Sequence, residues 1–166
     1  QISVPPTLIA FGITTVPADK VVSPELKKAG NKLYLIKHNA LANYMPNVEQ
    51  LKENWTYTTN AIQSGKICAA YALGFGGLAE AITKMSFGNE LAVDIQIAEN
   101  ELFDYNYGSI IVEATEDLTL PAAQYLGTVL EGTHLIINNE HISREALLKA
   151  CCGQFDKIYP SAVPAQ

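Results

Sequence analysis

The sequence has no long apolar run and no cluster of basic residues, and each absence argues against a class of protein. No apolar stretch approaches the roughly 18 residues that a membrane-spanning helix needs, so we expect no membrane partner. The 11 Lys and Arg residues are scattered among 17 Asp and Glu residues, and the net charge is -6. Nucleic acid is therefore not an expected partner, because phosphate binding needs a clustered basic face.

Cysteine is also scarce. The 3 cysteines are Cys68, Cys151 and Cys152. An odd number without CxxC spacing argues against a disulfide framework and against a zinc site, and it suits a reducing compartment, so we expect a cytoplasmic protein. The chain starts without Met or a signal pattern and ends in a Pro- and Ala-rich stretch at 160–166, both typical of one domain of a longer polypeptide.

Helical and strand-like segments interleave along the chain. The patterns predict strands at 7–16, 32–37, 67–73, 91–97, 109–114 and within 134–138. They predict helices at 23–30, 47–64, 78–87, around 121–126 and at 143–151. Because the two types do not alternate strictly, we expect an α+β fold in which helices pack on a mixed or antiparallel sheet.

The segment 47–64 has the strongest helical pattern. Its apolar face, at spacings of three and four, consists of Val48, Leu51, Trp55, Thr58 and Ile62. Asn47 is the expected N-cap, and Gly65 is expected to end the helix. On this pattern Trp55 belongs to the core, and its truncation to alanine is predicted to cost about 3–5 kcal/mol.

The sharpest local motif is Gly74-Phe75-Gly76-Gly77, between a predicted strand and a predicted helix. Glycines permit a sharp turn there and direct backbone amides at the helix N-terminus, where a phosphate can bind. The amides of Gly74, Gly76 and Gly77 are therefore candidate contacts to a phosphate or nucleotide. The alternative is that these glycines only permit close packing, since neither GxGxxG nor a P-loop lysine is present.

Other polar residues give weaker signals. The histidines share no helix face and have no acidic or thiol partner at ligand spacing, so we expect ordinary surface or loop residues at His38, His134 and His141. Acidic residues gather around one predicted strand end, at Asp94, Glu99, Glu101 and Asp104. Solvated loop acids are favoured there over a cation site, and no catalytic residue or metal ligand is assigned.

The glycine motif also carries a family resemblance. Residues 65–81 resemble the core motif of the AIR synthase-related superfamily, in which a strand leads into H-D-x-S-D-G-G-L and then a helix. The Gly76-Gly77-Leu78 run and the following helix match that motif. Residues 21–36 and 102–112 are also similar to superfamily segments. The polar positions of the motif differ, because this chain has Tyr71, Ala72, Gly74 and Phe75 there.

The resemblance implies a domain organisation. Residues 21–159 would form an AIR synthase C-terminal-type domain with a partly ferredoxin-like fold. Residues 1–20 would be the end of an upstream N-terminal-type domain, or the link from it. Residues 160–166 would be a linker toward a downstream domain, with 155–160 leading toward a glutaminase domain.

Within the superfamily the chain is most similar to the large, single-chain phosphoribosylformylglycinamidine synthases. These use ATP and glutamine to convert formylglycinamide ribonucleotide to formylglycinamidine ribonucleotide in purine biosynthesis. The resemblance implies ATP and Mg²⁺ for the whole enzyme and no cofactor for this domain. Its expected partners are the neighbouring domains of the same polypeptide and the small-molecule substrates of the whole enzyme, and self-association stays open.

The synthases that this chain resembles carry two tandem copies of a unit made of an N-terminal-type and a C-terminal-type domain, and one copy is degenerate. The missing polar side chains imply that this chain belongs to the degenerate second copy, so we expect the isolated chain to be inactive. Other superfamily enzymes remain alternatives, namely AIR synthase, selenophosphate synthetase and thiamine-monophosphate kinase. A purely structural domain also remains open.

Overall fold

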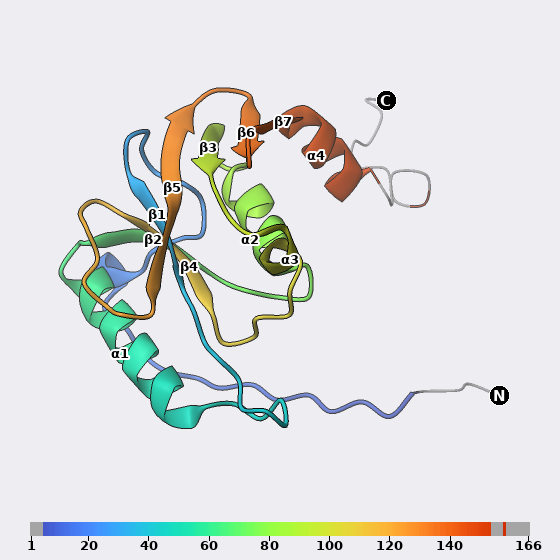
Figure 1. Ribbon diagram of the computed structural model, residues 1–166. Helices are drawn as coiled ribbons and strands as arrows, with labels where there is room; N and C mark the ends of the chain where they lie inside the picture. The colour runs from blue at the N-terminus through green and yellow to red at the C-terminus, as the bar shows by residue number, and fades with distance from the viewer. Residues whose placement is uncertain (1–4, 154–157, 159–166) are drawn as a thin grey trace, which may run out of the picture.

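The computed structural model describes residues 5–153 and 158, and a 7-stranded sheet with helices on both faces forms its centre (Figure 1). The strands are β1 (Lys32–Ile36), β2 (Ile67–Ala72), β3 (Leu91–Ile95), β4 (Ile110–Ala114), β5 (Ala123–Glu131), β6 (His134–Ile137) and β7 (Glu140–Ser143). The helices are the short 3₁₀ helix η1 (Ala18–Lys20), α1 (Val48–Gln63), α2 (Gly77–Met85), α3 (Glu99–Leu102) and α4 (Arg144–Cys152). None of these helices is both long and apolar enough to cross a bilayer.

The sheet is mixed and mainly antiparallel. Its strand order is β2-β4-β1-β5-β3-β6-β7, and only the pairing of β3 with β6 is parallel. Strands β1 and β2 are joined by α1 and flank β4, which is the split β-α-β arrangement of ferredoxin-like folds. The predicted α+β class is confirmed.

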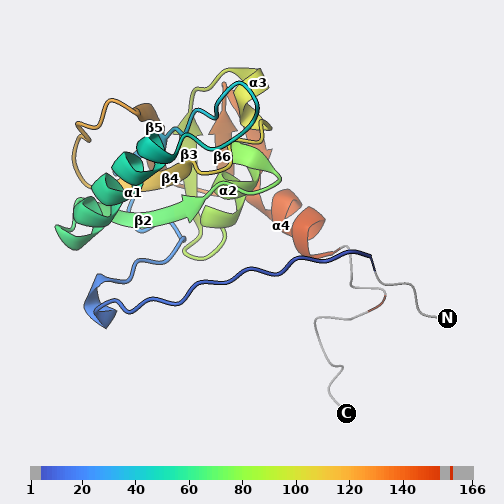
Figure 2. The same ribbon diagram turned by 90° about the horizontal axis from the view of Figure 1, so that it is seen from below.

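Two hydrophobic clusters lie on opposite faces of the sheet. Strand β1 separates them by simple alternation, since Leu33 and Leu35 join the cluster under α2 while Tyr34 and Ile36 join the cluster under α1. Figures 1 and 2 show α1 and α2 on these two faces. Both faces of the central strands are therefore buried, which explains the continuous apolar run of β1.

The predicted helix ends at Asn47, Gly65 and Ser143 are confirmed, whereas no helix follows the N-cap predicted at Ser23. The Asn47 side chain accepts a hydrogen bond from the Gln50 amide at 3.2 Å at the start of α1. Gly65, just beyond the end of α1, has φ +78°, a backbone conformation that glycine adopts without strain. Ser143 caps α4 in the same way as Asn47 caps α1. These ends depend on local chemistry, which is why the sequence pattern finds them.

The predicted core face of α1 is confirmed at Thr58, which is buried, and is wrong at Trp55. The buried residues of the helix are Asn54, Thr58 and Ala61, whereas Trp55 is 49% exposed. The Asn54 side chain donates a hydrogen bond to the Lys37 carbonyl at 3.0 Å, which fixes the rotation of the helix over the end of β1. Trp55 consequently lies at the border between the buried and the exposed face of the helix. Its Nε1 donates a hydrogen bond to the Gly108 carbonyl at 3.4 Å.

This rotation changes the expected cost of truncating Trp55. Because about half of its surface stays in solvent, Trp55→Ala should lower the free energy of unfolding by only about 1 to 2 kcal/mol. Leu35→Ala, at a fully buried position, should cost about 2–5 kcal/mol in the same urea titrations. Equal losses in the two variants would contradict the half-exposed position of Trp55.

The predicted strand at 7–16 is also wrong. The segment is extended, but it pairs with no strand among the described residues and runs away from the sheet in both views (Figures 1 and 2). Leu8 is 94% exposed and Ile13 is 89% exposed. β-Branched residues favour extended backbone, but a strand needs a partner strand for its hydrogen bonds.

The predicted helix at 23–30 is replaced by an irregular loop. Its amides bind elsewhere, since Leu26 donates to the Met85 carbonyl at 2.9 Å. The amides of Lys27 and Lys28 donate to the Glu113 carboxylate at 2.6 and 3.0 Å. Long-range partners therefore override the local signal for a helix start in Ser23-Pro24-Glu25, where a capping Ser precedes Pro and an acidic residue.

Residues 121–126 likewise form no helix. Strand β5 runs through this region and pairs with both β1 and β3, so tertiary pairing overrides the local signal. The sequence also did not predict α3 or β7. The other predicted strands and α2 lie at the expected places. The predicted linker at 160–166 and residues 155–157 lie outside the described residues, and the domain boundaries stay predictions.

Candidate functional site

The glycine motif lies where β2 ends and α2 begins. Gly76 is the N-cap of α2, and Gly77, its first residue, has φ +63°. A Cβ atom on Gly76 would lie 2.5 Å from the Cβ of Glu80, and one on Gly77 would lie 2.9 Å from the Asp104 carbonyl oxygen. Close packing alone thus requires both glycines. A contact between the amides of Gly74, Gly76 and Gly77 and a phosphate stays a prediction.

Glu80 places a carboxylate of the chain itself at this turn. Its Oε2 accepts a hydrogen bond from the Gly76 amide at 2.8 Å, and its Oε1 pairs with Lys84 Nζ at 2.5 Å. The Lys84 ammonium first, and the Gly76 amide second, hold the pKa of Glu80 below its usual value. The Gly77 amide also donates to the Gly74 carbonyl, at 3.1 Å, so two of the three candidate amides are occupied. An added anion would have to displace Glu80 from the Gly76 amide.

Three aromatic side chains stand beside the turn. Phe75 is 75% exposed, and its ring centroid lies 5.2 Å from that of Tyr105. The rings of Tyr105 and Tyr107 stack at 6.2 Å with an angle of 6°. Where the superfamily motif has polar side chains, this chain thus has an apolar rim.

The acidic residues near the strand end do not converge. Glu101 forms an ion pair with Lys37. Among residues 5–153 and 158, no three His, Cys, Asp or Glu side chains gather in a way that would hold a metal ion. The arrangement around Asp94, Glu99, Glu101 and Asp104 therefore has no cation-binding geometry.

His38 lies in a loop, one of the two predicted settings, but it is buried there, whereas His134 and His141 are exposed as predicted. The His38 side chain is 5% exposed. Its Nε2 accepts a hydrogen bond from the Asn47 amide at 3.0 Å, so its Nδ1 donates to the Tyr107 carbonyl at 2.7 Å. The neutral ring thereby joins the loop before α1 to the loop before β4. The pattern of polar and apolar residues cannot reveal this role. Both partners of His38 are backbone groups, which the identity of the side chains does not indicate.

Glu113 was likewise not singled out from the sequence. It is fully buried in β4, and its carboxylate accepts hydrogen bonds from the amides of Lys27 and Lys28 and from the Asn31 side chain at 2.6 Å. The sequence feature that could have identified Glu113 is an acidic residue inside the apolar run of β4. Its three donors give it a structural role in holding the loop before β1.

Cys68 is the cysteine nearest the core, and it is not an activated nucleophile. Burial, reinforced by the nearby Glu113 carboxylate, raises the pKa of its thiol to about 11. The thiol is therefore protonated at neutral pH, and a protonated thiol is a poor nucleophile.

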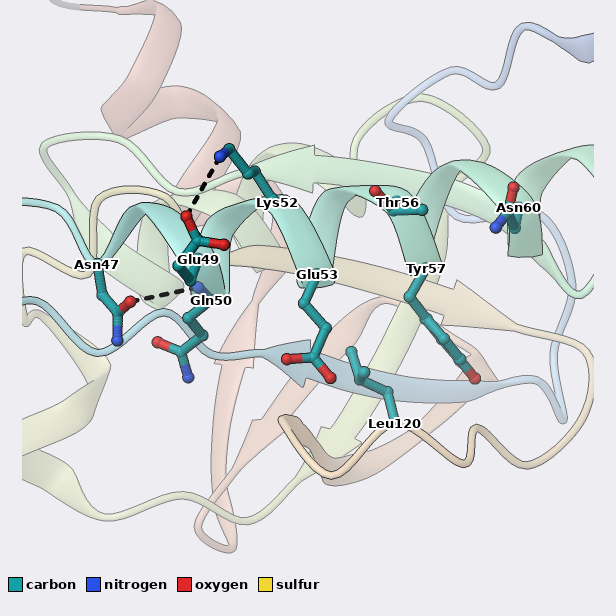
Figure 3. Close-up of a pocket in the computed structure, with 9 residues that line it drawn as sticks. All are labelled: Asn47, Glu49, Gln50, Lys52, Glu53, Thr56, Tyr57, Asn60 and Leu120. Carbon is teal, nitrogen blue, oxygen red and sulfur yellow. Dashed lines mark hydrogen bonds and ion pairs between the residues drawn. The ribbon is translucent and has the colours of Figure 1, made fainter.

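A shallow hollow of about 730 Å³ follows one side of α1 (Figure 3). Its polar lining residues mostly bind one another or the backbone. Lys52 pairs with Glu49 at 3.2 Å, Asn47 caps the helix, and the Tyr57 hydroxyl accepts from the Thr119 amide at 3.1 Å. Figure 3 shows these side chains along the flank of the helix rather than converging on one point. The hollow is a solvated helix surface without a catalytic constellation.

Solved structures show what this arrangement is similar to. Phosphoribosylformylglycinamidine synthase II from Thermotoga maritima matches with a TM-score of 0.66 at 12% identity, over 80% of this chain and 28% of that chain. T. maritima PurL complexed with ATP matches with a TM-score of 0.61 at 12% identity and the same coverage. The chain has the fold of an AIR synthase-related domain.

Escherichia coli HypE, a hydrogenase maturation protein, matches this chain with a TM-score of 0.55 at 10% identity, over 77% of this chain and 53% of HypE. No protein-family model matches the chain. The chain spans 28% of the length of the T. maritima PurL chains that it matches. Identities near 12% establish a likeness of fold.

Proposed function

We propose that this chain is a non-catalytic AIR synthase-related domain of a phosphoribosylformylglycinamidine synthase. In this proposal the parent polypeptide converts formylglycinamide ribonucleotide, glutamine and ATP to formylglycinamidine ribonucleotide. The fold shared with T. maritima PurL over 80% of this chain carries the proposal. Structures of T. maritima PurL have been solved in complexes with ATP and with FGAR. FGAR is formylglycinamide ribonucleotide, so both ligands are among the proposed substrates.

The local chemistry supports a non-catalytic role within that enzyme. The turn that is polar in the superfamily motif has Tyr71, Ala72 and Phe75 here. Its Gly76 amide is bound by Glu80, and the Cys68 thiol, at the opposite end of β2, is protonated. ATP and Mg²⁺ accordingly belong, in this proposal, to the whole enzyme, and the partners of the domain are its neighbouring domains.

The test of the parent activity is a direct assay of the polypeptide that contains this chain. Purified with its glutaminase function intact, it should produce formylglycinamidine ribonucleotide from the three substrates, as measured by mass spectrometry. Omitting ATP should abolish the product. A polypeptide that folds and consumes ATP but leaves formylglycinamide ribonucleotide unchanged would refute the assignment to this synthase.

The isolated chain is expected to hydrolyse neither ATP nor glutamine, because no described side chain is placed as an activated nucleophile or base. Phosphate and glutamate release, followed by coupled assays, should equal the rate without protein. A Cys68→Ala variant serves as the control. Turnover that the native chain shows and this variant lacks would demonstrate a catalytic thiol and contradict the prediction.

The glycine turn gives a separate prediction about anions. In an NMR titration with inorganic phosphate at neutral pH, the native chain should show weak amide shifts, with a Kd no tighter than about 1 mM, or about 4 kcal/mol. Glu80→Ala frees the Gly76 amide, so this variant should bind phosphate more tightly, with shifts confined to residues 74–79.

Glu49→Ala is the matched control, since it also removes one negative charge but lies at the first turn of α1. If Glu80→Ala and Glu49→Ala give the same response, the turn has no anion site. The three glycines then serve packing alone, and the assignment of the parent enzyme is unaffected.

A further inference from the structure

The extended segment 7–16, here called the arm, has the composition of a buried strand but lies in solvent. It carries no charged residue, and its alternate positions Ile9, Phe11 and Ile13 place three large apolar side chains on one side of an extended chain. All three are exposed, as is Leu8 on the other side. Such a surface is covered by a partner in a stable assembly.

The sheet offers two edges, and they differ in how they are protected. Strand β7 is short and includes Glu140 and His141, the polar type of edge that resists pairing with another chain. Strand β2 has the sequence Ile-Cys-Ala-Ala-Tyr-Ala without a charge, and within the described residues its backbone pairs only with β4. The outer edge of β2 is therefore open to a further strand.

The open edge borders an apolar groove. The groove has a volume of about 580 Å³ and lies between α1 and the strands β2 and β4. The groove is lined on the side of β2 by Ala70 and Ala72, and on the side of α1 by Trp55 and Ile62. The small alanine side chains leave room for large side chains from an added strand, and none of the lining residues is charged.

We propose that the arm of one copy of this chain adds as a strand to β2 of a second copy, with Ile9, Phe11 and Ile13 seated in the groove. The two surfaces are uncharged parts of a protein with a net charge of -6, so two copies can meet there without bringing like charges together. A reciprocal exchange of arms would bury on the order of 1,000 Å², the scale of a specific interface. The backbone edge supplies affinity, and the groove selects the register.

Sedimentation equilibrium of the 166-residue chain tests this proposal. The native chain should dimerise, whereas Phe11→Asp in the arm and Ala72→Lys at the edge should each weaken dimerisation by at least about tenfold. Val21→Lys is the matched control, because it changes an exposed apolar residue outside the arm and should leave the dimer intact. Circular dichroism verifies that each variant is folded.

Mixing provides a second measurement. The Ala72→Lys copy keeps an intact arm and the Phe11→Asp copy keeps an intact β2 edge, so their mixture should form heterodimers that neither variant forms alone. A monomeric native chain, a dimer unaffected by both substitutions, or an arm whose amides are protected within a monomer would each overturn the proposal. None of these outcomes bears on the assignment of the parent enzyme, because the arm exchange does not rest on it.

Discussion

Gly127→Ala is expected to lower the free energy of unfolding by about 3 kcal/mol or more, one of the two largest effects that the structure predicts for a single substitution. Gly127 is buried in β5, between β1 and β3. A Cβ atom there would lie 1.9 Å from the Asp94 carbonyl oxygen of β3. That contact involves backbone rather than a flexible side chain, so the alanine can be accommodated only by moving two central strands apart.

Urea titration followed by circular dichroism measures this effect. Gly65→Ala is the control, because a Cβ atom at Gly65 meets nothing within 4 Å and only the positive φ of +78° opposes it. That control should cost about 1 kcal/mol. If Gly127→Ala costs no more than Gly65→Ala, the close approach of β5 to β3 is contradicted.

Glu113→Ala should be the second large effect, at about 3 kcal/mol. The substitution leaves the amides of Lys27 and Lys28 and the Asn31 side chain without their common acceptor, and it also removes packed volume from β4. The loop before β1 should loosen first, because the carboxylate joins that loop to the sheet. Faster hydrogen exchange at residues 26–31 would report this loosening directly.

Two controls separate the acceptor role from a general loss of charge. Glu131→Ala removes an exposed glutamate from β5 and should change stability by less than about 0.5 kcal/mol. Glu113→Gln keeps the shape and one acceptor oxygen, so it should fall between the native chain and Glu113→Ala. A Glu113→Ala variant as stable as the Glu131→Ala variant would show that the buried hydrogen bonds contribute nothing.

Part of the candidate site could be predicted from the sequence, and part could not. The glycine turn, its helix and the loss of polar side chains were predictable, because turn chemistry and motif spacing are properties of adjacent residues. The occupation of the turn by Glu80 follows from helix geometry, since residues four apart share a face, but the sequence did not single it out. His38 and Glu113 were not predictable as buried residues, because their partners lie far away along the chain.

The sequence by itself determined the α+β class, the caps at Asn47 and Ser143, the glycine turn and most strands of the sheet. Each depends on hydrogen bonds or side-chain alternation within a few residues, so the local pattern contains the physical cause. Only the tertiary structure decided the rotation of α1, the strand at Ala123–Glu131 and the loop at 23–30. In those places backbone and buried polar groups found partners far away along the chain, and satisfying them outweighed the small differences in local propensity.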